Sequence, residues 1–256
     1  MTFCKPAQVI SSEKLSPSLK RIRLRLVGNW KWHVNGLGDE RIDISFPLPG
    51  ETVADFEYFN RPDYGQPADE PGPPWRHYTV RAVHDGGKEI DVDFVLHDGG
   101  IASSWAERAE PGHIVGLFAG SEHPRAYYAP PAQHDWQLLV ADATGLPGLA
   151  RILEDLPAGL SVQAVAEVPT EEDQLPLKSP ATIQWTWLVG SGGLDSQLPE
   201  AVAQLQLPAG DGYAWVACEA AAARRIRSTL RKQHGMPRDS HRAVGYWTAG
   251  REGHVD

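Results

Sequence analysis

The first half of the chain alternates apolar and polar positions with a period of two. The alternation, or a run of β-branched residues, recurs in short segments separated by Gly, Pro and Asp. Segments of this kind are typical of β-strands. We expect strands at residues 6–15, 20–28, 40–50, 76–83, 89–97 and 113–121. Six strands at this spacing predict a small β-barrel.

One short helix is expected to interrupt these strands, in the segment GGIASSWAERAEPG at residues 99–112. Ser104 and Glu107 have the spacing of a capping box, and Pro111 ends the element. A helix that follows a glycine-rich turn presents free backbone N–H groups and a positive dipole end, which suit a phosphate. A plain connecting helix has the same pattern, so this motif alone does not identify a site.

The pattern changes to alternating strands and helices in the second half. Residues 136–159 and 212–235 are each expected to form a strand, a turn and a helix. Strands are also expected at residues 160–168 and 181–189, and a helix at residues 196–207. Strands that alternate with helices imply a mainly parallel sheet. Ligands bind beyond the carboxyl ends of such strands, which indicates the turns at residues 142–145 and 218–220.

Composition indicates a globular protein with two domains, which we place at residues 1–130 and 131–256. The 256 residues are 41% hydrophobic, enough for a substantial core. We expect no membrane segment, because no window holds the roughly 20 apolar residues of a membrane helix. The formal net charge of −9 argues against nucleic acid as a partner. Cys4 and Cys218 form no CxxC motif, so we expect no metal site and a cytoplasmic location.

Charge is distributed unevenly along the chain. Residues 51–70 hold six carboxylates against one arginine, whereas residues 219–242 hold seven Lys and Arg against two carboxylates. Such an asymmetry can steer an anionic ligand toward the basic segment, and a solvated helix face would give the same pattern.

Six segments together resemble a known family. They are GLGDERIDISFPLPG, RHYTVR, DVDFVLHDGGIASSWAERAEPG, DATGLPGLARILEDLPAG, AWVACEAAAARRIRSTLR and GYWTAG, in this order. They resemble segments of the siderophore-interacting proteins, FAD-dependent NAD(P)H ferric-siderophore reductases related in fold to ferredoxin–NADP reductase. The resemblance covers nearly the whole chain. It implies an N-terminal antiparallel Greek-key β-barrel that binds FAD, followed by a Rossmann-like parallel-sheet domain that binds NAD(P)H.

The resemblance also implies an FAD site in the first domain. Arg76 resembles the arginine that pairs with the FAD pyrophosphate, for which its planar donor fork is suited. Tyr78 resembles the tyrosine against the isoalloxazine ring and Thr79 the residue near flavin N5, so these two are the catalytic candidates. The other cofactor contacts that it implies are Val80, His97, Ala102 and Ser103.

In the second domain the resemblance implies a nicotinamide site. Four residues match its two turns: Asp142 and Thr144 on one, Glu219 and Ala220 on the other. Two residues next to these turns differ from the family pattern. Gly145 occupies a position where alanine is usual, which we expect to loosen the turn. Cys218 occupies a position where glycine is usual, and its side chain is expected to narrow the pocket.

The implied reaction is hydride transfer from NADH or NADPH to FAD, followed by single-electron transfer to Fe(III) in a ferric siderophore. Reduction weakens a chelate built from hard oxygen donors and releases Fe(II) for iron assimilation. Anionic siderophores need a basic rim, for which Lys31, Arg125 and Arg242 are candidates. The basic helix at residues 224–232 is an alternative site for the 2′-phosphate of NADPH. We expect a monomer.

Two other functions stay open at this point. A non-catalytic flavin protein that binds siderophores or assists iron release is suggested by the departures at Gly145 and Cys218. A general NAD(P)H-dependent flavin reductase with another acceptor, such as a quinone or free flavin, fits the same motifs. The sequence identifies neither the siderophore nor the preferred nucleotide.

Overall fold

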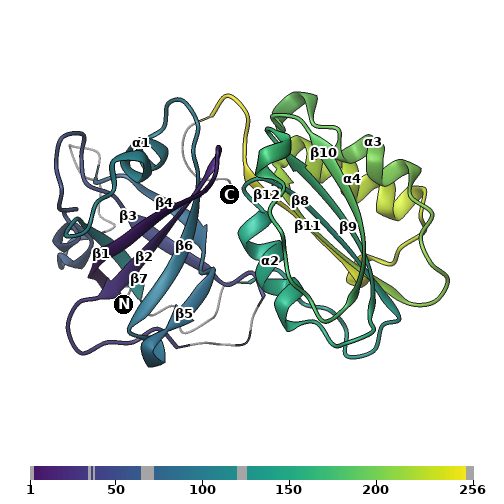
Figure 1. The fold of residues 1–256 in the computed structure, drawn as a ribbon, viewed down its shortest axis with the longest axis horizontal. Helices are drawn as coiled ribbons and strands as arrows, with labels where there is room; N and C mark the ends of the chain where they lie inside the picture. Colours follow the sequence, from purple (N-terminus) through teal and green to yellow (C-terminus); the bar gives the residue numbers. More distant parts are fainter. Residues whose placement is uncertain (1–2, 34–35, 37, 65–71, 120–125, 252–256) are drawn as a thin grey trace. The chain divides into compact units, whose positions relative to one another are not determined.

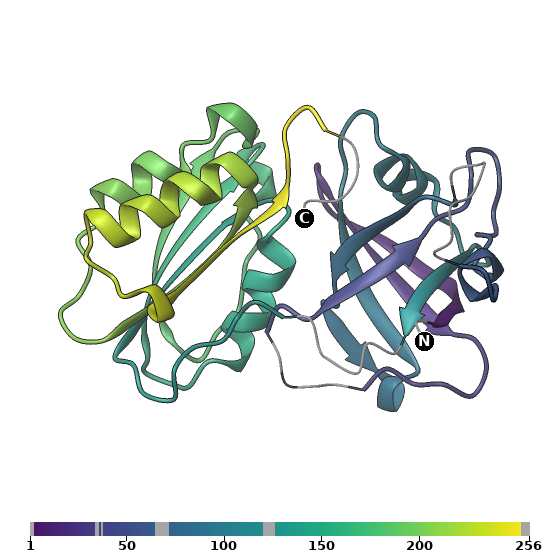
Figure 2. The ribbon, with the colours of Figure 1, turned by 180° about the vertical axis from the view of Figure 1, so that it is seen from behind.

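The chain folds into two compact units, Met1–Arg125 and Ala126–Asp256. The computed structural model, drawn in Figures 1 and 2, describes residues 3–33, 36, 38–64, 72–119 and 126–251. The segment before residue 130 is tied to the second unit. The Ala129 N–H donates to the Tyr213 hydroxyl at 2.9 Å, and the Gln137 side chain donates to the Tyr128 hydroxyl at 2.8 Å.

The first unit is a seven-stranded antiparallel sheet wrapped around one core. In spatial order the strands are β4 (Trp75–Thr79), β3 (Arg41–Ser45), β7 (Ile114–Ala119), β1 (Phe3–Ser16), β2 (Leu19–Leu26), β6 (Glu89–Val95) and β5 (Ala82–His84). Alternate residues point inward and are buried, as Ile90, Val92 and Phe94 are on β6. The period of two in the sequence therefore has a direct structural cause, because every second side chain faces the core.

The strand expected at residues 76–83 is divided into β4 and β5. The Val80 N–H donates to the Glu40 carbonyl, whereas the next residue, Arg81, donates its N–H to the Asp91 carbonyl of β6. The backbone thus leaves one partner and joins another between these two residues, which ends β4 at Thr79.

Helix α1 (Ile101–Arg108) begins three residues before the expected capping box. The prediction of a capping box that starts at Ser104 is wrong, because the Ser104 N–H already donates to the Gly100 carbonyl in the first helical turn. Gly100 is the N-cap residue, with a φ of 81° that favours glycine. Two short 3₁₀ turns, η1 (Glu57–Asn60) and η2 (Asp85–Gly87), complete the described elements of this unit.

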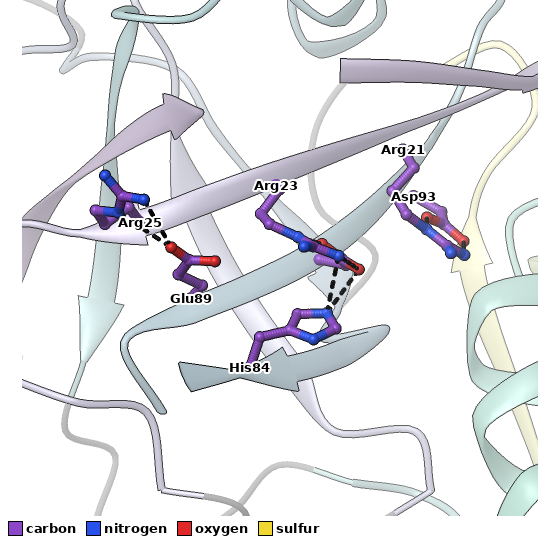
Figure 3. A network of polar contacts seen from close by, with 7 residues as sticks. Arg21, Arg23, Arg25, His84, Glu89 and Asp93 are labelled. Atoms are coloured by element: carbon purple, nitrogen blue, oxygen red, sulfur yellow. Dashed lines mark hydrogen bonds and ion pairs between the residues drawn. The ribbon is translucent and has the colours of Figure 1, made fainter. Parts of the chain in front are cut away.

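A ladder of ion pairs joins β2 to β6 on the outer face of the first unit (Figure 3). The pairs lie directly across the two strands: Arg21–Asp93, Arg23–Asp91 and Arg25–Glu89. Asp91 is 2% exposed and also lies 2.8 Å from Nε2 of His84 on β5. Burial alone would raise the pKa of Asp91, but hydrogen bonds from Arg23 and His84 lower it below its usual value. The ladder therefore fixes the register of β2 and β6 through nearly buried carboxylates.

Replacing Asp91 with asparagine is expected to destabilise the first unit by about 1–3 kcal/mol at neutral pH, since Arg23 loses its partner. Because the folded state lowers the pKa of Asp91, its stabilisation is present above pH 4 and is lost as the pH falls further. Urea unfolding at neutral and acidic pH measures both effects. Glu89→Gln, at the exposed end of the ladder, is the control. An equal loss of unfolding free energy in both variants would contradict the stabilising role assigned to the buried part of the ladder.

The second unit is a five-stranded parallel sheet. In spatial order its strands are β10 (Thr182–Val189), β9 (Ser161–Val168), β8 (Trp136–Asp142), β11 (Gly212–Glu219) and β12 (His241–Trp247). Helices α3 (Leu198–Gln204) and α4 (Ala220–Lys232) pack on one face, and α2 (Leu146–Asp155) covers the other (Figures 1 and 2). The sequence pattern did not predict β12 as a strand. The predicted fold class, an antiparallel β-barrel followed by a parallel α/β unit, is confirmed.

The turns at the carboxyl ends of the parallel strands contain the residues predicted to bind the nucleotide. Helices α2 and α4 start there, and two 3₁₀ turns, η3 (Glu171–Asp173) and η4 (Gly193–Asp195), follow β9 and β10. A third turn, η5 (Arg238–Ser240), precedes β12 at the opposite edge. None of the helices in the described part of the chain has the length and apolarity of a membrane span.

Candidate functional site

Strand β4 presents different side chains on its two faces. The opposed pairs across β3 and β4 are Ile44–Arg76, Ile42–Tyr78, Asp43–His77 and Arg41–Thr79. Directly opposed residues project to the same side of a sheet. Arg76 and Tyr78 therefore share the face of the buried isoleucines, whereas His77 and Thr79 lie on the other face. The two catalytic candidates, Tyr78 and Thr79, do not form one side-chain surface.

Arg76 lacks an acidic partner among the described residues. The residue is half-buried, and Nη1 donates to the Trp75 carbonyl at 2.8 Å in a partly buried hydrogen bond. The three arginines of the ladder, in contrast, all pair with carboxylates. A partly desolvated guanidinium without a counter-charge is unfavourable unless an anion binds it. Its fork of N–H donors matches phosphate oxygens, so Arg76 suits a pyrophosphate.

Tyr78 forms an aromatic platform with the barrel core. Its ring centroid lies 4.4 Å from that of Phe94 and 6.1 Å from that of Phe46. Trp105 of α1 packs behind both rings, at 5.2 Å from Phe46 and 5.5 Å from Phe94. Burial raises the pKa of the Tyr78 phenol above its usual value, so the hydroxyl stays protonated. The platform is thus neutral and rigid, as a flat aromatic ligand requires.

The N-terminus of α1 is open. No side chain caps it, and the turn before it consists of Gly99 and Gly100, with φ values of 75° and 81°. A side chain on Gly99 would meet nothing within 4 Å, whereas one on Gly100 would approach Cε1 of His97 to 3.0 Å, so the turn is open on the Gly99 side and bordered by His97 on the other. No described residue accepts from the N–H groups of residues 101–103, and buried Ala102 lies among them. Backbone donors at a helix N-terminus favour an anion.

Ser103 and His97 hold this turn in shape. The Ser103 hydroxyl accepts from the His97 N–H at 2.9 Å and donates to the His97 carbonyl at 2.8 Å. The only proton of the hydroxyl is therefore used, and Ser103 can donate to an anionic ligand only through its backbone N–H. The side chain of His97 is exposed. Together, Arg76, the Tyr78 platform and the open helix end fit the pyrophosphate and the ring of FAD.

In the second unit, Asp142 joins three strand ends at the carboxyl edge. Its Oδ1 accepts from the N–H and hydroxyl of Thr144 at 2.9 and 2.6 Å and from the Gly145 N–H at 3.3 Å. Its Oδ2 accepts from the Glu219 N–H at 2.9 Å and from the Trp247 indole at 2.7 Å. Burial raises the pKa of Asp142, and these hydrogen bonds oppose the rise. Asp142 therefore organises the edge.

Glu219 caps its own helix. Its Oε2 accepts from the N–H groups of Ala221 and Ala222 at 2.5 and 3.0 Å, and Oε1 accepts from Ala249 at 3.4 Å. The N-terminus of α4 is thus occupied by a carboxylate and is not an open phosphate site. Ala220 lies buried beneath it, where a Cβ on Gly245 would collide with it. The predicted turns meet, but their carboxylates make internal contacts.

The turn at Gly145 is tight, and the expectation that glycine loosens it is wrong. Gly145 has an ordinary φ of −84°. A Cβ there would collide with the Ala217 carbonyl and approach the Ala141 Cβ to 2.9 Å. The missing side chain is what allows this turn to pack against β11.

Cys218 also departs from expectation. Along β11 alternate residues face opposite sides, so Ala217 lies beneath Gly145 whereas Cys218 faces the α3–α4 core beside Ala222. Its side chain is fully buried. Burial, followed by the nearby carboxylates Asp142 and Glu219, raises the pKa of the thiol. Cys218 is therefore a neutral core residue and does not narrow a ligand pocket.

Of the candidate rim cations, Lys31 belongs to the first unit and Arg242 to the second. Lys31 is exposed near the β5–β6 turn, where the Trp32 N–H donates to the Gly87 carbonyl at 2.7 Å. Arg242 is exposed near the start of β12, at the amino end of its sheet. Arg125 lies outside the described residues.

Comparison with known proteins identifies the family. The model of the siderophore-interacting FAD-binding domain matches residues 8–123, and that of the siderophore-interacting protein matches residues 134–250. The NADPH-dependent ferric-chelate reductase of Escherichia coli is 33% identical over 186 residues, covering 70% of this chain and 68% of that protein. The chain belongs to the siderophore-interacting protein family. The predicted family is thus confirmed.

Further proteins are similar to this chain in sequence, in fold or in both. Ferric vibriobactin reductase of Vibrio cholerae is 31% identical over 180 residues, covering 69% of this chain and 65% of that protein. A siderophore utilization protein from T. fusca is 27% identical, with a TM-score of 0.80 that covers 98% of this chain and 95% of that one. The FAD/NAD-binding domain of a nitric oxide dioxygenase from Vibrio cholerae shares only the fold, at 13% identity, a TM-score of 0.65 and coverage of 94% and 98%.

Two site residues were missed from the sequence. Trp247 lay in the GYWTAG segment without an assigned role, yet its indole bonds Asp142 and lies 3.6 Å from the Cβ position of Gly192. Glu167, 1% exposed at the end of β9, accepts from the Ser196 hydroxyl at 2.6 Å. The carboxyl-end rule applied to β9 would have found Glu167.

Proposed function

We propose that this protein is an FAD-dependent reductase that passes electrons from NADH or NADPH to a ferric siderophore. The observation that carries the proposal is Arg76, a half-buried arginine without an acidic partner among the described residues. It lies in a unit that matches a siderophore-interacting FAD-binding domain. Relatives named as ferric-chelate and ferric vibriobactin reductases support the reaction.

Each cofactor contact has a separate task in this proposal. Arg76 and the N–H groups of Ala102 and Ser103 would bind the pyrophosphate, and Tyr78 would lie against the ring. Thr79 and Val80 would position the ring from the end of β4, and His97 would border the site. When bound, FAD supplies the conversion of a two-electron donor into a one-electron donor.

The second unit would position the nucleotide. Asp142, Thr144, Glu219 and Ala220 shape the carboxyl edge, where ligands of parallel sheets bind. The carboxylates of Asp142 and Glu219 already accept hydrogen bonds within the protein. We therefore assign them a positioning role, in which they hold the two turns at the separation that a nicotinamide requires. Lys31, Arg125 and Arg242 stay candidates for contact with an anionic chelate. Transfer of single electrons to Fe(III) needs no acid or base from the protein.

The non-catalytic alternative rested on Gly145 and Cys218. The first closes the turn against β11, and the second lies in the core, so neither favours a degenerate nucleotide site. The reductase is therefore the function that the geometry supports best.

Anaerobic addition of NADH or NADPH to the FAD-loaded protein tests the donor step. We expect at least one nucleotide to bleach the flavin absorbance with a stoichiometry of about one nucleotide per flavin, because each hydride carries the two electrons that one flavin accepts. Chemical reduction by dithionite is the control that the bound flavin is reducible. A flavin that dithionite bleaches and neither nucleotide does would contradict the proposed donor.

A further inference from the structure

We infer that the electron donor is NADH in preference to NADPH, and that Glu171 and Glu172 set this preference. The inference rests on the proposed function, since it concerns the nucleotide of the same reaction. It follows from the charges and the geometry at one edge of the second unit, at the carboxyl ends of β9 and β10.

Glu171 and Glu172 lie where the ribose of a dinucleotide binds in this type of sheet. In Rossmann-like units an acid near the end of the second strand accepts a hydrogen bond from the ribose 2′-hydroxyl, whereas an arginine accommodates a 2′-phosphate. Strand β9 is the second strand of this sheet, and η3 follows it with Glu171 and Glu172 exposed. A third exposed acid, Asp195, lies in η4, which follows the adjacent β10 and packs against α4.

Internal hydrogen bonds fix both loops. Asp173 is fully buried, and its Oδ2 accepts from the Thr170 hydroxyl at 2.9 Å and from the Thr170 N–H at 3.2 Å. Glu167, on β9, accepts from the Ser196 hydroxyl at 2.6 Å and from the Gln197 N–H at 3.1 Å, which ties the loop after β10 to the end of β9. The exposed acids are therefore held on an ordered edge.

Positive charge is absent from the same part of the sequence. No Lys or Arg occurs in residues 152–177 or 179–223. Lys178 precedes β10 at the amino edge, next to Ser179, whose hydroxyl donates to the Leu153 carbonyl near the end of α2. The loops after β9 and β10 therefore carry no cation for a 2′-phosphate.

The basic helix α4 does not supply the missing charge. Arg225 pairs with Glu200, and Arg227 donates to the Ala243 carbonyl. Arg231 and Lys232 occupy the last turn, at the amino edge of the sheet. Arg224 is the cation of α4 nearest its start, and α4 packs against η4, but α4 follows β11, and β8 separates β11 from β9 and its loop η3. The alternative in which this helix binds a 2′-phosphate at η3 is therefore disfavoured.

The physical contrast between the two nucleotides is large at such an edge. A phosphate monoester carries nearly two negative charges at neutral pH, so the exposed carboxylates of Glu171 and Glu172, in a turn without Lys or Arg, repel it. A free 2′-hydroxyl instead donates a hydrogen bond to a carboxylate. Opposed effects of this kind produce discrimination of roughly tenfold or more between otherwise identical ligands.

Equilibrium binding of NAD⁺ and NADP⁺ to the FAD-loaded protein, measured by calorimetry, tests the inference without reference to turnover. We expect NAD⁺ to bind at least about tenfold more tightly, and the gap to narrow at high ionic strength because salt screens the repulsion. Glu171→Lys/Glu172→Lys should reduce the ratio by about tenfold or reverse it. The matched control is Asp211→Lys/Asp239→Lys, with the same charge change at two exposed acids of the amino edge.

The outcomes separate the two claims. NADP⁺ binding as tight as that of NAD⁺, with bleaching by NADPH, would overturn the inference and leave the reductase in place. A ratio that the η3 variant changes no more than the control does would overturn the assignment to Glu171 and Glu172. Failure of both nucleotides to bind and to bleach the flavin would overturn the proposed donor, and the inference with it.

Discussion

Arg76→Ala protein is expected to purify with less than about a tenth of the FAD of the wild type. A charge-assisted contact to a phosphate contributes about 2–4 kcal/mol, and each 1.4 kcal/mol is a tenfold change in affinity, so the dissociation constant should rise by roughly 30-fold to 1,000-fold. The ratio of flavin to protein absorbance measures occupancy, and quenching of flavin fluorescence on titration measures affinity.

Two variants define what a negative result means. Arg25→Ala removes an exposed arginine of the same unit that pairs with Glu89, and it should keep its flavin. Arg76→Lys keeps the charge but loses the planar fork, so it should bind FAD with intermediate affinity. Arg76→Ala protein with a full complement of FAD would show that the pyrophosphate lies elsewhere.

Asp142→Ala is expected to cause the largest loss of stability in the second unit. The substitution leaves the donors of Thr144, Glu219 and Trp247 without an acceptor in a buried place. Uncompensated buried polar groups of this number cost about 3–5 kcal/mol, or roughly 10 °C in Tm. Asp142→Asn should also destabilise, because an amide N–H₂ at the position of Oδ2 would face two donors. Thermal unfolding followed by circular dichroism measures both.

The control for this second prediction is Asp195→Asn. Asp195 is an exposed acid at the same edge, and its removal should change stability by no more than about 0.5 kcal/mol. A Tm of Asp142→Ala equal to that of Asp195→Asn would show that the hydrogen bonds at the carboxyl edge do not organise the strand ends.

The strands and the change of fold class could be predicted because burial imposes a period on the sequence. Every second residue of β2 and β6 faces the core, and this pattern needs no knowledge of the partner strand. The division of residues 76–83 into β4 and β5 could not, because it depends on which backbone accepts from Val80 and Arg81. Partners distant in sequence leave no local signal.

The candidate site shows the same limit. Types of residue suited to phosphate and flavin were visible in RHYTVR, but the unpaired state of Arg76 depends on the placement of carboxylates elsewhere in the fold. Gly145 and Cys218 were misread for a related reason. Whether a glycine loosens a turn or a cysteine enters a pocket depends on the neighbouring strand, here the Ala217 carbonyl and the core side of β11.

Acceptor specificity is the central claim, and the second step of the anaerobic titration tests it most directly. After a nucleotide has bleached the flavin, a ferric siderophore is added, with its redox-inert gallium complex as the control. We predict that the iron complex restores the oxidised flavin, at about two ferric chelates per flavin, and that a chelator of Fe(II) traps the released metal. Reoxidation no faster with the iron complex than with gallium would contradict a ferric-siderophore reductase.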